Sequence, residues 1–272
     1  MKNGFGNAKT INPMKKKYLN EVRLRLQSEK TGISEILTEN DMQHLPEPVK
    51  SYIRYAGFVG KEKISNVFLK ASGQIRSSEK SGWMQFTSEQ YNFFDFPFRA
   101  FYIRAVKMGV PAVGLHLYKN ETATMVIKLL NLFTVVDAKG PEMNQAETVT
   151  VLNDMCFMAP GSLINRNITW ETMDTGQVKA TFTNGQITVS AILTFDVEGK
   201  LINFLSFDRF ETSDGKIYIN NPWETPVKEY KTVNGYRLPS KADVIYKRPE
   251  GDFCYLEFRL EEIKYNLKNS LL

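Results

Sequence analysis

The sequence predicts a mainly β protein of the α+β class, in which antiparallel strands form one strongly curved sheet. From residue 64 to residue 265, short segments of alternating apolar and polar residues follow one another with few breaks. Turn dipeptides such as Asn234-Gly235 and Glu250-Gly251 join neighbouring segments, as in antiparallel hairpins. About a dozen strands cannot remain flat, because each adds roughly 20 degrees of twist, so we expect them to curl into a half-barrel.

The first part of the chain differs from the rest in charge. Residues 1–30 carry eight Lys and Arg against two Glu, although the whole chain has a formal net charge of only +5. The remaining chain is therefore close to neutral, which argues against a nucleic-acid-binding protein. Because the strand pattern continues without a linker, we interpret residues 31–272 as a single domain and residues 1–30 as a basic N-terminal extension.

Within this extension, residues 1–13 are rich in Gly and Asn and are expected to be disordered. Residues 14–29 predict a basic helix with Leu19, Val22 and Leu26 on one side. Two interpretations remain open for this helix. It either contacts an anionic membrane surface or packs loosely on the domain as a solvated helix.

A second short helix is expected to begin at Pro48 and to end at Gly57 or Gly60. Strands follow it, interrupted by one helix in the middle of the chain. The expected strands are residues 67–76, 83–94, 98–108, 112–119 and 123–136, and, after that helix, residues 187–197, 201–211, 225–233, 236–247 and 253–265.

The mid-chain helix, an insertion at residues 145–164, organises this prediction. Apolar residues recur there at steps of three and four, and Pro160 and Gly161 end the pattern. A curved sheet must cover its concave face, so we expect this helix to lie in the mouth of the half-barrel. The space between the helix and the sheet is either filled by side chains or open to an apolar ligand. The apolar positions are Val149, Leu152, Met155, Cys156 and Ala159.

Three ionisable residues are candidates for acid–base chemistry. Strand alternation places His116 on the face opposite Leu115 and Leu117, where a carboxylate could orient it as a general base. Glu147 and Asp154 are seven residues apart on the helix and share a face. A structural histidine and a buried ion pair explain the same three residues.

Asp154 in particular needs a partner, because a charge among apolar neighbours is costly. The candidate partners are Arg99, Arg104 and Arg209. Cys156, flanked by apolar residues, is expected to be buried and inert. The sequence contains no phosphate loop, dinucleotide fingerprint, zinc spacing or nucleophile elbow, so we expect neither a cofactor nor a metal.

Aromatic residues are dense between residues 83 and 102, and part of this segment is expected to line the concave face beside the helix. Aromatic and Met side chains suit acyl chains or other apolar ligands. The predicted ligand-binding residues are Gln90, Tyr91, Phe93, Phe101, His116, Tyr118, Leu152, Asp154, Met155 and Arg209.

No apolar run approaches the roughly 20 residues of a membrane-spanning helix, and the N-terminus lacks the apolar core of a secretory signal. We therefore expect a soluble chain that is cytoplasmic or peripheral to a membrane rather than secreted. The oligomeric state is left open.

Four stretches carry a resemblance to a known family: Gln90-Tyr91-Asn92, Gly114-Leu115-His116, residues 147–156 and Ile168-Thr169-Trp170-Glu171. With them, residues 45–266 resemble the uncharacterised bacterial domain-of-unknown-function family 6544, which has no established activity. The resemblance implies an architecture similar to the periplasmic lipoprotein carriers LolA and LolB, in which a curved sheet and helices enclose a cavity for acyl chains. Unlike those carriers, this sequence shows neither a signal peptide nor a lipidation cysteine near its start, so the resemblance implies their shape and not their periplasmic role.

Three functions fit these observations. The first is a non-catalytic module that binds a lipid or other apolar ligand between the concave sheet and the helix. The second is an enzyme acting on a small apolar substrate through His116, Glu147 and Asp154. The third is a structural or interaction protein with a filled interior.

Overall fold

The computed structural model describes residues 12–29 and 35–269. The disorder predicted for residues 1–13 falls almost entirely outside these ranges. The α-helices are α1 (Pro13–Ser28), α2 (Glu47–Ala56) and α3 (Pro141–Met158), and the 3₁₀ turns are η1 (Glu39–Met42) and η2 (Pro160–Ile164). The strands before α3 are β1 (Asn66–Ile75), β2 (Met84–Phe93), β3 (Phe98–Lys107), β4 (Val110–Lys119), β5 (Thr122–Leu129) and β6 (Phe133–Lys139). Those after it are β7 (Ile168–Thr172), β8 (Gln177–Asn184), β9 (Ile187–Phe195), β10 (Leu201–Ser206), β11 (Phe210–Glu211), β12 (Ile219–Asn220), β13 (Trp223–Glu224), β14 (Val227–Val233), β15 (Tyr236–Arg248) and β16 (Gly251–Tyr265).

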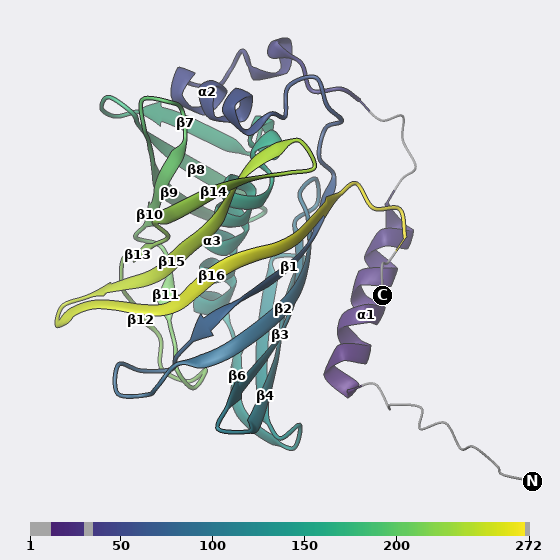
Figure 1. Cartoon of the computed structure of the whole chain (residues 1–272), viewed down its shortest axis with the longest axis vertical. Helices are drawn as coiled ribbons and strands as arrows, with labels where there is room; N and C mark the ends of the chain where they lie inside the picture. The colour runs from purple at the N-terminus through teal and green to yellow at the C-terminus, as the bar shows by residue number, and fades with distance from the viewer. Residues whose placement is uncertain (1–11, 30–34, 270–272) are drawn as a thin grey trace, which may run out of the picture.

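One antiparallel sheet of 14 strands forms the body of the protein, in the order β6-β5-β4-β3-β2-β1-β16-β15-β13-β10-β9-β8-β7, with β14 paired to β15. The β1–β16 pairing joins the first and last strands of the chain, so the two halves of the sheet form one continuous wall. This wall curls around α3 (Figure 1). The predicted curved half-barrel with covering helices is confirmed.

The helix α3 lies inside the curve and begins earlier than expected, at Pro141 instead of residue 145. The prediction that it has one apolar face is wrong, because every residue from Ala146 to Met158 is buried. A helix buried on all sides is enclosed by its surroundings. Its polar residues are therefore inside the protein and need partners there.

The strand boundaries differ from expectation in several places. The segment predicted as one strand at residues 201–211 is β10 and β11, and β11 pairs with β12 in a separate two-stranded sheet. The segment predicted as one strand at residues 123–136 is two strands, β5 and β6, joined at Leu130 and Asn131, which both adopt positive φ angles. The sequence prediction also missed β7 and β8, which extend the sheet beyond β9. The turn at Asn234-Gly235 is present between β14 and β15.

A loop closes part of the open side of the half-barrel. The segment between β11 and β12 reaches the free edge strand β6, where the Tyr218 hydroxyl donates to the carbonyl of Lys139 at 3.1 Å and accepts from its amide at 3.2 Å. Gly215 lies so close to Asp137 that a Cβ atom there would be 2.7 Å from the Asp137 carbonyl oxygen. The loop between β11 and β12 therefore connects its half of the sheet to β6, the edge strand of the other half.

The other two helices pack outside this enclosure. The predicted second helix is confirmed as α2, which ends at Gly57 in the left-handed conformation (φ 78°). Its Tyr52 hydroxyl donates to the carbonyl of Cys156 at 2.7 Å, so α2 is attached directly to α3.

The helix α1 lies along the outer side of the sheet, against β3 and β4 (Figure 1). Its residues Tyr18, Val22 and Leu26 are buried in a second apolar cluster with outward-facing sheet residues. In this arrangement the apolar side of α1 is not available to a membrane, contrary to the membrane-contact interpretation. None of the described helices combines the length and the hydropathy needed to cross a bilayer.

Candidate functional site

The guanidinium of Arg99 is the centre of a buried polar cluster between β2, β3, β4 and α3. Its Nη1 donates to Oε1 of Glu147 at 2.8 Å, and its Nε donates to Oδ2 of Asp154, also at 2.8 Å. Only 8% of the Arg99 side chain is exposed. One cation on the sheet therefore binds both carboxylates that α3 presents seven residues apart.

Two amide side chains from β2 complete the shell around Asp154. Gln90 Nε2 and Asn92 Nδ2 each donate to Oδ2 of Asp154 at 2.7 Å, and Gln90 Oε1 accepts from Arg99 Nη2 at 3.1 Å. Gln90 and Asn92 share a face because they are two residues apart on a strand. The carboxylate of Asp154 thus has enough donors to be stable without water.

His116 lies on the other side of Glu147. Its Nε2 is 3.0 Å from Oε2 of Glu147, but the two atoms are not aligned for a hydrogen bond, and both lack a hydrogen-bond partner among the described residues. Its Nδ1 is 3.4 Å from Nη1 of Arg99, so a neutral ring that accepts there carries its proton on Nε2.

Burial decides the protonation of this cluster. Burial, with Arg99 and Arg209 nearby, holds the pKa of His116 well below its usual value, so the imidazole is neutral near pH 7. Burial raises the pKa of Glu147 and of Asp154, and the charge of Arg99 offsets part of that rise. Two carboxylates then face two guanidinium groups, and the cluster is close to electrically balanced.

Arg209 comes from the opposite wall, just after β10. Its guanidinium stacks over Trp223 at 4.6 Å and lies 5.9 Å from the ring of Tyr246. Its charge acts on both Glu147 and His116. Of the three arginines predicted as partners of Asp154, Arg99 is correct. The charge of Arg209 acts on Glu147 instead, and Arg104 is exposed.

The polar cluster continues into an apolar surface on the same concave face. Strand register places Phe101, His116 and Met125 side by side, and the next inward-facing positions toward the β3–β4 and β5–β6 turns are Ile103, Gly114 and Ile127. We call Phe101, Ile103, Met125 and Ile127 the concave ladder. All four side chains are partly exposed, although they lie on the inner face.

Gly114 lets the side chains of Ile103 and Ile127 pack closely over the backbone of β4. A Cβ atom at this position would lie 2.8 Å from Cγ2 of Ile103 and 3.5 Å from Cγ1 of Ile127. A larger residue at this position would therefore displace these two side chains and disturb the concave ladder. The opposite wall contributes Val244, Tyr255 and Phe258, which are also partly buried and pack against the same core.

The predicted ligand-binding residues fall into three groups. Gln90, Phe101, His116, Tyr118, Asp154 and Arg209 belong to the inner face or to the cluster described above. Leu152 and Met155 are fully enclosed in the core around α3.

Tyr91 and Phe93 form the third group, and their predicted place on the concave face is wrong. Both belong to the cluster under α1 on the outer side of the sheet. Strand alternation puts them opposite Gln90 and Asn92, and α1 supplies the apolar cover that makes two aromatic residues favourable on an outer face. The sequence prediction did not include Ile103, Met125 or Ile127, although alternation from His116 and its neighbours could have found them.

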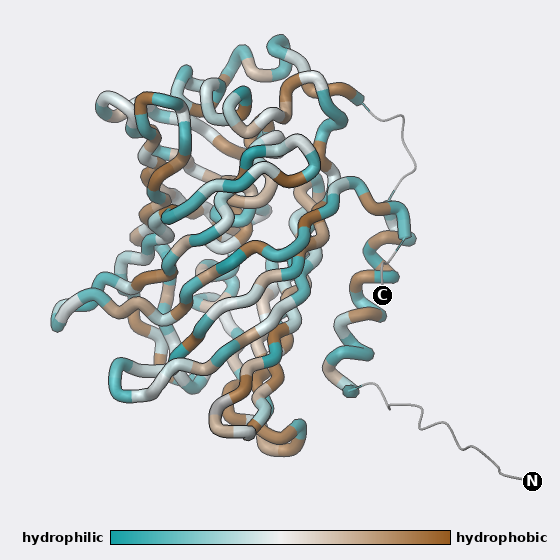
Figure 2. The backbone as a smooth tube through the Cα atoms, in the orientation of Figure 1, coloured by the Kyte–Doolittle hydropathy of each residue, from teal (hydrophilic) through white to brown (hydrophobic). Residues whose placement is uncertain are grey.

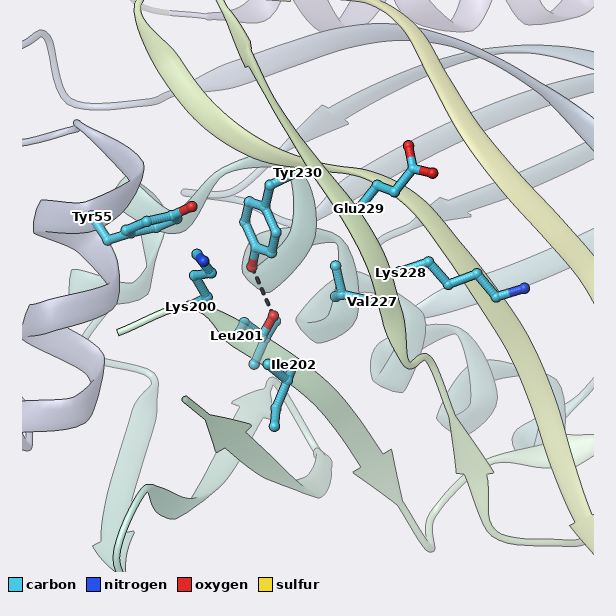
Figure 3. A pocket seen from close by; sticks show the side chains of 8 residues that line it. All are labelled: Tyr55, Lys200, Leu201, Ile202, Val227, Lys228, Glu229 and Tyr230. Atoms are coloured by element: carbon cyan, nitrogen blue, oxygen red, sulfur yellow. Dashed lines mark hydrogen bonds between the residues drawn. The ribbon is translucent and has the colours of Figure 1, made fainter. Parts of the chain in front are cut away.

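A separate surface pocket of about 260 Å³ lies between α2, β10 and β14. Figure 3 shows Tyr55, Lys200 and Tyr230 turned toward this hollow, while Lys228 and Glu229 extend away from it. The Tyr230 hydroxyl donates to the carbonyl of Leu201 at 2.8 Å. Lys200 pairs with Glu198, so this pocket offers a ligand few free polar groups.

Cys156 is buried and free, and burial raises the pKa of its thiol, so it is not a nucleophile in this fold. Among the residues that the structure describes, no group of three or more His, Cys, Asp or Glu side chains is arranged to hold a metal ion. The cluster around Arg99 has side chains that could bind a polar group or transfer a proton at His116 and Glu147.

Several solved structures are similar to this chain. A DUF1329 family protein from Desulfovibrio piger aligns over 82% of this chain and 94% of its own, with 11% sequence identity and a TM-score of 0.45. A domain described as an outer membrane lipoprotein-sorting protein, from Vibrio parahaemolyticus, aligns over 74% of this chain and 85% of its own, with 7% identity and a TM-score of 0.41. No curated protein matches the sequence. Residues 35–258 match the family of unknown function DUF6544, and the chain belongs to this family, as the resemblance in its sequence indicated.

Proposed function

We propose that the protein is a non-catalytic module that binds an apolar small molecule, such as a lipid acyl chain, on the part of the concave face that α3 leaves uncovered. The observation that carries this proposal is the partial exposure of the concave ladder: Phe101, Ile103, Met125 and Ile127. Inward-facing apolar side chains of a folded sheet are normally removed from water. Here they remain partly in contact with it, and an apolar ligand would complete their burial.

The concave ladder lies directly beside the polar cluster. The ring of Phe101 is 4.8 Å from the guanidinium carbon of Arg99 and pairs in register with His116. A ligand with one polar end could place that end near His116 and Arg209 and its apolar part along the ladder. Since the cluster is already balanced in charge, the proposal requires no particular charge on the ligand.

This location differs from the one expected from the sequence. The residues of α3 are enclosed by the core, so a ligand between the whole length of α3 and the sheet would have to displace packed side chains. Displacing a close-packed core residue costs several kcal/mol, on the order of 2–5 per large side chain. A ligand bound beyond the polar cluster, on the concave ladder, avoids that cost.

The proposal is tested by mass spectrometry of organic extracts of the purified protein, together with titration by the fluorescent fatty acid cis-parinaric acid. We expect co-purified lipid, or saturable binding of the probe, in the wild type. The variant Gly114→Leu forces Ile103 and Ile127 out of their positions on the concave ladder and should lose both signals while it remains folded. An empty extract and no saturable probe binding would reject the proposal.

The acid–base alternative depends on one observation, the 3.0 Å separation of His116 Nε2 and Glu147 Oε2 in a cluster that retains slight exposure. A neutral imidazole beside a carboxylate has the composition of a general acid–base pair. The balanced ion pairs with Arg99 also fit a purely structural role, so this remains the second candidate. Turnover of a small ester or amide library that is lost in His116→Gln, while the variant remains folded at the assay temperature, would favour the enzyme.

A further inference from the structure

The most exposed apolar surface of the described chain is a projecting tip formed by two hairpin turns, between β3 and β4 and between β5 and β6. Figure 2 shows this end of the molecule as its most continuous hydrophobic region. Met108 is 95% exposed, Leu132 73% and Phe133 64%. The other exposed apolar residues of the tip include Val110, Leu130 and Val135.

The two turns form one structure. β4 and β5 are paired, with Ala112 opposite Leu129, and the amide of Leu130 donates to the carbonyl of Pro111 at 2.9 Å. Apolar residues project from both faces of these hairpins, so the tip is a convex wedge and not one side of a groove.

Folding does not require this composition. Met108 (φ 49°) and Leu130 (φ 52°) have the left-handed backbone conformation that Gly and Asn adopt most readily. Met and Leu are poor residues for such turns, and their side chains gain nothing from the fold because they point into solvent. Apolar side chains retained at strained, exposed positions indicate a surface that is buried against something else.

The charges around the tip favour an anionic partner. Among the side chains that the structure describes, the two hairpins, residues 104–112 and 127–137, carry Arg104 and Lys128 against Asp137 alone. The side chain of Asn12, at the start of α1, donates to Asn131 in the β5–β6 turn, which brings the exposed Lys16 and Lys17 to the same end of the molecule.

We infer that the tip inserts into the interfacial region of an anionic lipid bilayer. A convex apolar wedge with a basic surround matches a membrane interface, where apolar side chains enter the acyl region and Lys and Arg remain among anionic headgroups. This contact would use the tip in place of the apolar side of α1, which the sheet occupies. It goes beyond ligand binding on the concave ladder and does not depend on it.

The test is flotation of the full chain with vesicles of phosphatidylcholine alone and of an equal mixture of phosphatidylcholine and phosphatidylglycerol. We expect the wild type to bind the mixed vesicles, and the double variant Leu132→Glu/Phe133→Glu to bind them at least about tenfold more weakly, because burial of two large apolar side chains is lost. The matched control Met173→Glu/Val197→Glu adds the same charge at exposed apolar positions in the β7–β8 and β9–β10 turns and should bind like the wild type.

Insertion itself is followed with Phe133→Trp, whose fluorescence should shift to the blue and be quenched by brominated lipid, whereas Val197→Trp should show neither change. The inference is overturned if the wild type does not bind mixed vesicles or if the control double variant loses binding equally. It is also overturned if the tip instead joins two copies of the chain. In that case the wild type would be a dimer that binds no vesicles, and Leu132→Glu/Phe133→Glu would be a monomer. The tip variant should still bind cis-parinaric acid in solution, which separates this test from that of the ligand proposal.

Discussion

Nε of Arg99 lies 2.8 Å from Oδ2 of Asp154, and the same guanidinium reaches Oε1 of Glu147 through Nη1 at 2.8 Å. Arg99 belongs to β3, whereas both carboxylates belong to α3, which the chain forms only after three more strands. This pair of contacts therefore holds the enclosed helix to the wall of the half-barrel. The carboxylates are buried, so removal of Arg99 would leave both without their ion-pair partner.

Arg99→Gln should therefore be strongly destabilising. Removing one member of a buried ion pair leaves uncompensated charge and typically costs about 3–5 kcal/mol. Chemical denaturation should show this loss in the free energy of unfolding. Arg104→Gln, on the same strand but exposed, should change it by no more than about 0.5 kcal/mol. Similar small effects from both substitutions would show that the cluster does not stabilise the fold.

Stability should fall as the pH falls from about 8 to 5.5, through the contribution of His116. Its pKa is well below the usual value in the folded state, so the unfolded chain binds the extra proton first as the pH drops below about 6.5. The raised pKa values of Glu147 and Asp154 act in the opposite sense, because these groups favour folding when protonated. The variant His116→Gln isolates the imidazole contribution.

The difference in melting temperature between the wild type and His116→Gln should therefore become smaller, or change sign, toward acidic pH. At acidic pH, His116 of the wild type takes up a proton on unfolding, and this lowers the stability of the folded state. The variant has no imidazole at this position, so it does not lose stability in this way. Melting curves over this pH range provide the measurement. A difference that stays constant with pH would mean that His116 titrates alike in the folded and unfolded states.

The docking of α1 should depend on Val22 and not on Leu24. Val22 is fully buried against the outer face of the sheet, whereas Leu24 is 51% exposed on the same helix. Val22→Asp places an unpaired charge in an apolar cluster and should release the helix. Limited trypsin digestion should then cut faster at Lys16, Lys17 or Arg23, and a dye that binds apolar surface should show more fluorescence. Leu24→Asp should change neither, and equal digestion of both variants would contradict this account of α1.

The strand periodicity was sufficient to predict the inner and outer faces around His116, because a strand with one dry face repeats every two residues. The same reasoning failed on α3, where one apolar face was predicted but the whole circumference is buried, including Thr148, Thr150 and Asn153. These polar residues are buried and find partners inside: the Tyr118 hydroxyl, the Ala146 carbonyl and the Thr225 hydroxyl. The pattern of polar and apolar residues along a helix shows which positions are polar. It does not show whether those polar side chains will find hydrogen-bond partners inside the protein.

Tyr91 and Phe93 were misplaced for a related reason. Aromatic density indicates burial but not which face of the sheet is covered, and the cover here is α1, about 70 residues earlier in the sequence. Of the concave ladder, only Phe101 was predicted, because Ile103, Met125 and Ile127 look like ordinary core residues in the sequence. Only their partial exposure in the folded sheet distinguishes them.

The most direct test of the ligand proposal is the affinity of cis-parinaric acid for the wild type and for Gly114→Leu, with Thr124→Leu as the control. Thr124 lies on β5 beside Met125, so its side chain points to the opposite, outer face. We predict saturable binding to the wild type and to Thr124→Leu, and binding at least about tenfold weaker to Gly114→Leu at an unchanged circular dichroism spectrum. Equal affinity of all three proteins would contradict the placement of a ligand on the concave ladder.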